Sequence, residues 1–322
     1  MRTSLSTLTG WLVAATCLAG CASAYTIKSP LTVLEESAVF QPIRYPGPKG
    51  AWDQKEKIGA EDAWFATEDF LQLHGWYLPH KDPVAIVLFC HGNAGNVATQ
   101  AETLKVLHDR HRLSVMTFDY RGYGKSEGDP SEDGLMLDAR AARKWLARRE
   151  KIDEKDIVLV GHSLGGGVAV DLAAGDGARG LVLASTFSSL PDVAHFQTPA
   201  IPRSMLQNRM NSVAKIRNYH GPLLQIHGDR DTVIPYKLGQ KLFKAANEPK
   251  QFVTNQGAGH NEPMTDEGRE ALDKFFASLP PMDGQSDLAA READGEAEEL
   301  ESLPDDGVDT AAHGATVAPR AR

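Results

Sequence analysis

The sequence predicts an α/β fold: a mostly parallel, doubly wound sheet with helices on both faces and a small cap. Three observations favour it. Apolar runs of strand length alternate with segments of helical pattern over most of the chain, which is typical of parallel sheets. The runs are apolar throughout rather than at every second position, as expected for strands that are covered on both faces. One run leads into Gly161-His162-Ser163-Leu164-Gly165, where a strand must turn into a helix within one or two residues.

The first residues predict export. The second residue is basic, and the apolar stretch 8–19 that follows is too short to span a bilayer. Leu18-Ala19-Gly20-Cys21 is similar to the lipobox of bacterial lipoproteins, whose cysteine receives the lipid. We therefore expect a lipoprotein signal peptide over residues 1–20 and a lipid anchor at Cys21, which would hold the protein at a membrane of the bacterial cell envelope, at the outer membrane or facing the periplasm. The alternative is a soluble secreted or periplasmic protein, since Ala22-Ser23-Ala24 also fits the general signal peptidase.

The segment after the signal is expected to form only a leader. Prolines and glycines recur in residues 21–60, which predicts an extended leader with little regular structure. The main domain is expected over residues 61–280. It begins at residues 64–78, whose apolar pattern predicts one or two antiparallel strands with a partly exposed face, at the edge of the sheet.

The alternation of strands and helices follows. Strands are expected at residues 84–90, 113–118, 156–161, 180–184, 223–227 and 251–254. Helices are expected at residues 98–108, 131–149, 164–174, 236–246 and 266–278. The interval 185–221 interrupts the alternation and carries apolar residues among prolines and polar residues. It is expected to form a small cap over the site or, as the alternative, a loop that packs on the body.

Charge and composition limit the possible partners. Residues 281–322 hold eleven acidic residues and three arginines, a balance of −8, so the rest of the chain carries about −1 of the total charge of −9. A nearly neutral body gives no support for nucleic-acid binding. The same segment is rich in alanine and poor in aromatic residues, so it is expected to be disordered.

The three cysteines do not support a disulfide framework. Cys17 lies in the segment expected to be removed and Cys21 at the anchor, so one ordinary thiol remains. Cys90 ends an apolar strand and is expected to be a small buried hydrophobe rather than a reactive group.

Ser163 is the candidate nucleophile. A tight turn from strand to helix exposes its hydroxyl on a strained backbone, and the flanking glycines remove side chains that would collide. A serine hydroxyl needs a base, and His260 is expected to serve because it follows the last strand, at the sheet edge where the nucleophile also emerges. The acid that orients the base is expected after another strand. Asp231 is preferred to Asp229, which lies directly at the strand end, where a turn-forming role is more common.

The oxygen that becomes negative during acyl transfer needs main-chain N–H donors. One is expected from Leu164, because the first amides of a helix are unpaired and the helix dipole favours negative charge. The other is expected from the HGNAGN loop at residues 91–96, with Asn93 as the donor. No metal-binding motif and no P-loop lysine accompanies these residues, so no cofactor is expected.

Five motifs together resemble the α/β-hydrolase superfamily. They are HGNAGN at residues 91–96, DYRGYGKSEG at 119–128, GHSLG at 161–165, HGDRDTVIP at 227–235 and GH at 259–260. The resemblance spans roughly residues 36–280 and keeps the family order of motifs. The HGNAGN wording is similar to a branch of serine esterases, thioesterases and lipase-like enzymes. The resemblance implies the α/β-hydrolase fold, a triad of Ser163, Asp231 and His260, and an oxyanion hole formed by Asn93 and Leu164.

The acid motif departs from the family in one place. Val233 and Pro235 stand one residue apart where the family usually has valine and proline adjacent, so Ile234 is interpreted as the replaced valine and Asp231 keeps its place. The stretch 119–128 is interpreted as structural, its charged and aromatic side chains bracing the loop between a strand and a helix.

These observations predict a serine hydrolase with a small-molecule ester or acyl substrate. We expect it to cleave carboxylic esters or thioesters with an apolar acyl group through an acyl-enzyme intermediate. Two alternatives remain open. One is a peptidase of the same fold, since aminopeptidases share the triad, and the other is a non-catalytic lipoprotein that keeps the fold as a binding scaffold.

Overall fold

The computed structural model describes residues 30–200 and 202–282. The expected signal peptide, the anchor residue Cys21 and nearly all of the acidic tail lie outside these residues, and those predictions stay untested. Within the described ranges, no helix is both long and apolar enough to cross a membrane.

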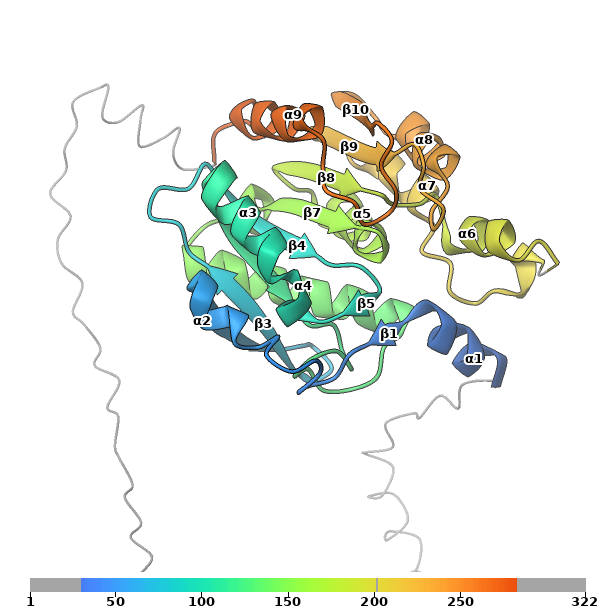
Figure 1. The fold of residues 1–322 in the computed structure, drawn as a ribbon, viewed down its shortest axis with the longest axis horizontal. Coiled ribbons are helices and arrows are strands. Elements are labelled where there is room, and N and C mark those ends of the chain that lie inside the picture. Colours follow the sequence, from blue (N-terminus) through green and yellow to red (C-terminus); the bar gives the residue numbers. More distant parts are fainter. Residues whose placement is uncertain (1–29, 201, 283–322) are drawn as a thin grey trace, which may run out of the picture. The chain divides into compact units, whose positions relative to one another are not determined.

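An eight-stranded sheet forms the centre of the domain (Figure 1). Its order is β10-β9-β8-β7-β4-β6-β3-β2, and the strands from β10 to β6 are parallel. The strands are β2 (Glu61–Ala66), β3 (Gln72–Leu78), β4 (Ala85–Cys90), β6 (Leu113–Phe118), β7 (Val158–His162), β8 (Gly180–Ala184), β9 (Leu223–Gly228) and β10 (Lys250–Asn255). The predicted mostly parallel sheet is confirmed, with the antiparallel pair β2 and β3 at one edge.

Two details of β7 and β4 bear on the sequence predictions. β7 begins two residues later than predicted because the preceding residues form a short 3-10 turn, η2 (Glu154–Asp156), which starts where the Asp153 side chain accepts the N–H of Lys155. Cys90 at the end of β4 is fully buried and unpaired. The burial confirms the expectation of a small buried hydrophobe, and it raises the pKa of the thiol to about 12.

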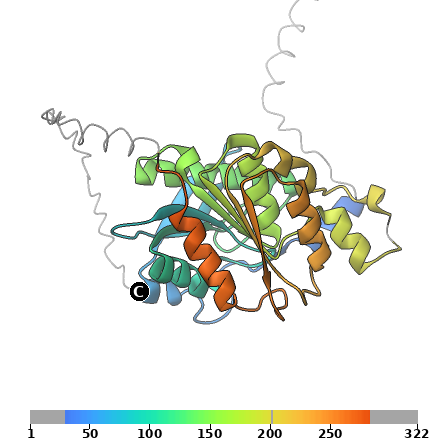
Figure 2. The ribbon, with the colours of Figure 1, turned by 90° about the horizontal axis from the view of Figure 1, so that it is seen from above.

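Helices cover both faces of the sheet, as predicted (Figures 1 and 2). One face packs against α4 (Glu132–Glu150), α5 (Leu164–Asp176) and α8 (Tyr236–Ala245). The opposite face packs against α3 (Ala101–His111) and α9 (Asp266–Ala277). The α3 helix begins later than predicted because a 3-10 turn precedes it, capped by the Asn96 side chain.

The prediction of little regular structure over residues 21–60 is wrong for the part that the structure describes. The segment contains α1 (Pro30–Val39), β1 (Gln41–Pro42) and α2 (Gln54–Ile58). The proline that begins α1 costs no hydrogen bond, because the first N–H groups of a helix have no partner inside it. β1 pairs in parallel with β5 (Ala94–Gly95), which belongs to the HGNAGN loop. Contacts to distant parts of the chain therefore order a segment whose composition predicts a coil.

The interval expected to form a cap contains only short helices. They are α6 (Leu190–Gln197), η3 (Arg203–Met205), α7 (Ser212–Lys215) and η4 (Ile216–Asn218). Two carboxylates from elsewhere bind four successive main-chain N–H groups of this interval. Glu35 of α1 accepts those of residues 207 and 208, and Glu132 of α4 accepts those of residues 209 and 210. A covering role over the site stays a prediction.

Candidate active site

The candidate nucleophile lies on a sharp turn between β7 and α5. Ser163 has φ 54° and ψ −118°, a conformation that residues with a side chain rarely adopt. The turn is this tight because glycines border it. A Cβ on Gly161 would lie 2.5 Å from the carbonyl oxygen of Gly165, and a Cβ on Gly165 would overlap the carbonyl oxygen of Cys90. The nucleophile turn, residues 161–165, is thus possible only with these two glycines.

Ser163, His260 and Asp231 form a continuous chain of hydrogen bonds. His260 Nε2 lies 3.0 Å from Ser163 Oγ, and His260 Nδ1 lies 2.7 Å from Asp231 Oδ2. An ionised carboxylate can only accept, so Nδ1 carries the imidazole proton and leaves Nε2 free to accept from the serine hydroxyl. The structure therefore brings together the three residues expected from the sequence, in an arrangement that can move a proton from the serine to the histidine.

The electrostatics keep the acid ionised. Burial alone would raise the pKa of Asp231, but hydrogen bonds from His227, His260 and the N–H of Ile234 outweigh it and hold the pKa well below its usual range. The other carboxylate oxygen, Oδ1, accepts the N–H groups of Val233 and Ile234 at 2.9 and 2.8 Å. These bonds orient Oδ2 toward His260.

Asp229 joins two loops. Its carboxylate accepts the N–H of Gly257 at 2.7 Å and so ties the acid loop to the loop that carries His260. Of the two aspartates weighed from the sequence, Asp231 is therefore the one that contacts the base.

Two further histidines belong to the site and were missed. His227 Nε2 lies 3.0 Å from the carbonyl oxygen of Ile234 and 3.4 Å from Asp231 Oδ2, so a second imidazole donates toward the acid. His162 Nε2 lies 3.4 Å from the carbonyl oxygen of His260. Burial, and next the charge of His260, lowers the pKa of His162 to about 4, which keeps it neutral near pH 7. His227 belongs to the HGDRD motif and His162 to the GHSLG motif, but neither motif indicates which residues its histidine contacts.

The HGNAGN loop lies beside the nucleophile. A Cβ on Gly92 would lie 3.5 Å from Ser163 Cβ, an ordinary van der Waals distance, so the loop packs directly against the nucleophile. Asn93 is partly buried, and its side-chain amide donates to the carbonyl oxygen of Val39 at 3.1 Å, which leaves the main-chain N–H as its donor for an oxyanion. Leu164 is the first residue of α5, where main-chain N–H groups lack partners within the helix.

The stretch 119–128 has the bracing contacts that were interpreted as structural. The fully buried Asp119 accepts the N–H of Val97 at 2.8 Å, and Arg121 pairs with Asp138 of α4 at 2.8 Å and with Asp69 at 2.9 Å. These contacts hold the loop after β6 against α4 and against Val97, which begins the 3-10 turn that follows the HGNAGN loop.

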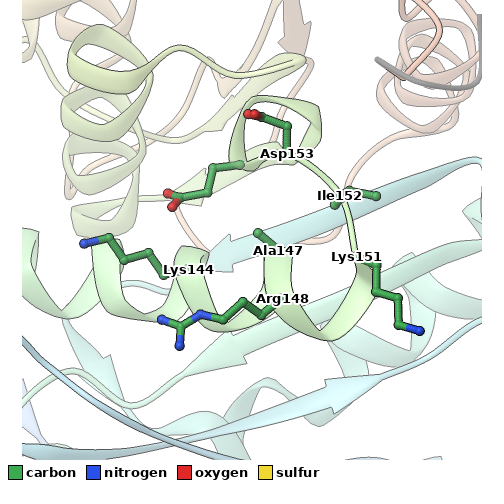
Figure 3. Close-up of a pocket in the computed structure, with 7 residues that line it drawn as sticks. Lys144, Ala147, Arg148, Lys151, Ile152 and Asp153 are labelled. Carbon is green, nitrogen blue, oxygen red and sulfur yellow. The ribbon is translucent and has the colours of Figure 1, made fainter. Parts of the chain in front are cut away.

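Two depressions lie outside this constellation. The larger, about 450 Å³, is at the C-terminal end of α4 (Figure 3). It is lined by Lys144, Ala147, Arg148, Lys151, Ile152, Asp153 and Glu154. These residues precede β7 whereas Ser163 follows it, so the depression and the nucleophile lie at opposite ends of that strand. The smaller, about 200 Å³, is lined by Ser189, Pro191, Arg203, Arg209 and Asn211 in the interval expected to form a cap.

Comparisons with known proteins agree with the fold. A family model for the alpha/beta hydrolase fold matches residues 85–211. An uncharacterized protein of Mycobacterium tuberculosis is 43% identical over 215 residues, which cover 66% of this chain and 76% of that protein. The uncharacterized protein YfhR of Escherichia coli is 34% identical over 251 residues, which cover 70% of this chain and 86% of that protein.

A solved structure shares the architecture at lower sequence identity. The Pyrococcus furiosus esterase Pf2001 superposes with a TM-score of 0.61 at 21% identity, over 74% of this chain and 99% of its own. At this identity the likeness concerns the fold alone.

Proposed function

Because this chain belongs to the α/β-hydrolase superfamily, we propose that it is a serine hydrolase that cleaves carboxylic esters or thioesters through an acyl-enzyme intermediate. The observation that carries the proposal is the hydrogen-bonded chain from Ser163 Oγ through His260 to Asp231, with links of 3.0 and 2.7 Å. This order of contacts supports a nucleophile, a base and an orienting acid.

The geometry supports the following steps. Ser163 Oγ attacks the substrate carbonyl carbon while its proton passes to His260 Nε2, and the imidazolium is stabilised by the ionised Asp231. The carbonyl oxygen becomes negative and accepts the main-chain N–H groups of Asn93 and Leu164. The C–O or C–S bond to the leaving group breaks as His260 returns the proton to that group. Water then attacks the acyl carbon while His260 takes its proton, the bond from the acyl carbon to Ser163 Oγ breaks, and His260 returns the proton to Ser163 as the free acid leaves.

An apolar acyl group is the substrate class that the surface favours. Phe196 of α6 and Met205 of η3 are 45% and 48% exposed, although both are large and apolar. A contiguous exposed apolar patch favours contact with an apolar ligand, and α6 and η3, which carry these side chains, pack against each other. The HGNAGN wording, which is similar to a branch that includes lipase-like enzymes, points the same way.

Labelling with a fluorophosphonate probe tests the enzyme proposal. The full-length protein should become labelled, and Ser163→Ala should abolish labelling and reduce ester hydrolysis by a factor of about 10⁴ or more. Folded wild-type protein that neither reacts with the probe nor hydrolyses esters would contradict the proposal and favour a binding scaffold.

A substrate panel distinguishes an esterase or thioesterase from a peptidase of the same fold. Wild-type protein should turn over p-nitrophenyl esters and acyl thioesters of increasing chain length, and it should leave aminoacyl and dipeptidyl amides intact. Faster cleavage of the amides would make the protein a peptidase of the same fold.

We also propose that the protein is a lipoprotein of the bacterial cell envelope, anchored at Cys21. The lipobox similarity at residues 18–21 supports it. Metabolic labelling with a clickable fatty acid should depend on Cys21, and labelling that persists in Cys21→Ser would refute the anchor.

A further inference from the structure

Two tyrosines of the DYRGYGKSEG stretch contact the main chain of the HGNAGN loop. Tyr120 donates its hydroxyl to the carbonyl oxygen of His91 at 3.0 Å, and Tyr123 donates to that of Asn93 at 2.7 Å. Both tyrosines have no exposed surface. Buried hydroxyls with defined partners hold the main chain in one position, because breaking the bond would leave a polar group without water.

The segment 39–43 binds the same loop from another direction. The N–H of Gln41 donates to the carbonyl oxygen of Asn93, and the N–H of Ile43 donates to that of Gly95, both at 3.1 Å. In return Asn93 donates its side-chain amide to the carbonyl oxygen of Val39 at 3.1 Å. This is the pairing of β1 with β5, which lie beside each other in Figure 1. Asn93 therefore has both its carbonyl and its side chain bound by residues far away in the sequence.

The peptide before Asn93 is held as well. His91 Nδ1 lies 2.8 Å from the carbonyl oxygen of Gly92, and because a carbonyl can only accept, Nδ1 carries the proton. In a trans peptide the C=O and the following N–H point in opposite directions. Fixing the Gly92 carbonyl toward the His91 ring therefore turns the N–H of Asn93 to the other side of the peptide, in a loop that lies against Ser163.

We propose that Tyr123 and Tyr120, together with the segment 39–43, are positioning residues that hold the main-chain N–H of Asn93 in place for the oxyanion. This inference rests on the proposed hydrolase function. Its physical basis is preorganisation: a donor that is already fixed costs no rearrangement when the negative charge forms. A displacement of about 1 Å in such a donor can lower the rate by up to about a hundredfold. The residues of the DYRGYGKSEG stretch would then act on the reaction through Asn93 without touching the substrate.

Tyr123→Phe is the most direct test. The change removes one hydroxyl and keeps the ring, and the carbonyl oxygen of Asn93 retains the N–H of Gln41, so the fold should survive. With a p-nitrophenyl ester, kcat should fall about tenfold while KM changes less than twofold. The inhibition constant of a trifluoromethyl ketone, which forms a tetrahedral oxyanion on the serine, should rise by about the same factor.

Tyr219→Phe is the matched control. Tyr219 is also buried, and its hydroxyl also lies within hydrogen-bond distance of main-chain carbonyl oxygens, those of Ala178 and Pro222. These two residues precede β8 and β9, at the opposite end of the sheet from Ser163. This control should lose as much thermal stability as Tyr123→Phe and keep wild-type kcat and inhibitor affinity.

Asn93→Ala gives a second, independent reading. It keeps the main-chain N–H and removes only the tie to Val39, so it should also lower kcat and inhibitor affinity without raising KM. The inference is overturned if both Tyr123→Phe and Asn93→Ala match Tyr219→Phe in kcat and inhibitor affinity. If wild-type protein itself fails to hydrolyse esters and to bind the ketone, the proposed function is at fault, which distinguishes the two failures.

Discussion

The nucleophile turn and the HGNAGN loop lie side by side, yet different kinds of contact hold them. The sharp bend of the nucleophile turn depends on neighbours in sequence, since Gly161 and Gly165 approach each other across it. The HGNAGN loop takes its position from residues 29 to 54 positions away, namely the two tyrosines after β6 and the segment 39–43. The five-residue motif at 161–165 can therefore specify the conformation of the nucleophile turn. The motif at residues 91–96 supplies only the glycines and the hydrogen-bond donors of the HGNAGN loop, and distant residues set its position.

The two regions also meet at Gly165. Gly165 is the second residue of α5 and the last of the nucleophile turn, and its Cα faces the main chain of Cys90 and His91, where β4 passes into the HGNAGN loop. A substitution at Gly165 should therefore affect both regions. Substitutions elsewhere in each region should affect that region alone.

Gly165→Ala should have the largest effect. The new methyl group would overlap the carbonyl oxygens of Cys90 and His91, which belong to a central strand and its end and cannot move aside. We expect the free energy of unfolding to fall by at least about 3 kcal/mol and ester hydrolysis to be lost. Urea denaturation followed by circular dichroism measures the first, and p-nitrophenyl ester turnover the second.

Gly175→Ala is its control on the same helix. The nearest atom to a Cβ there is the guanidinium nitrogen of Arg140 at 3.4 Å, the end of a flexible side chain. Alanine should be neutral or stabilising by up to about 1 kcal/mol. Equal stability of both alanine variants would show that the close approach at Gly165 does not constrain the fold.

Acidification should have the next largest effect, through His162. Its ring belongs to the nucleophile turn and lies near Gly92 of the HGNAGN loop. The pKa is lowered to about 4 in the folded protein, against about 6.5 in an unfolded chain. Between these values the unfolded chain binds a proton that the folded protein does not, so stability is lost as pH falls from about 6.5 to about 4.

The expected loss from His162 is about 2 kcal/mol, less than the full shift implies because the side chain is only partly buried. Free energies of unfolding at several pH values from 7 to 4 measure it, and His162→Gln should flatten the profile. His91 adds to the slope with the same sign, since burial also lowers its pKa. An unchanged profile in His162→Gln would assign the whole acid sensitivity to other groups.

Thr186→Val should have the smallest effect and tests how local the nucleophile turn is. Thr186 lies after β8 and donates its hydroxyl to the carbonyl oxygen of Ser163 at 2.8 Å. That oxygen also accepts the N–H of Gly166, so losing the hydroxyl should cost only about 1 kcal/mol and change kcat less than threefold. Thr186→Ser, which keeps the donor, is the control. A loss of kcat as large as that of Tyr123→Phe would mean that distant contacts position both regions equally.

Features that depend on neighbours in sequence could be predicted from the sequence, and features that depend on distant contacts could not. Strand and helix positions could be read from the apolar runs, and the order of serine, aspartate and histidine follows the motif order. The helix α1 could not, because the prolines and glycines that recur over residues 21–60 predict a coil and the order of α1 depends on contacts such as Glu35 with the N–H groups of residues 207 and 208. His227 was equally hidden: its role depends on a loop that folds back over four residues to bring Asp231 within 3.4 Å.

The sequence by itself determined the alternation of strands and helices and the residue types at the ends of the strands, because these depend on the pattern of apolar residues and on the needs of a tight turn. Only the tertiary structure decided that Asp231 rather than Asp229 contacts the base and that the histidine 97 residues after Ser163 lies within hydrogen-bond distance of it. It also decided what holds Asn93. The physical reason is that hydrogen bonds are directional and short, so their partners are chosen by the packing of the whole domain and not by neighbours along the chain.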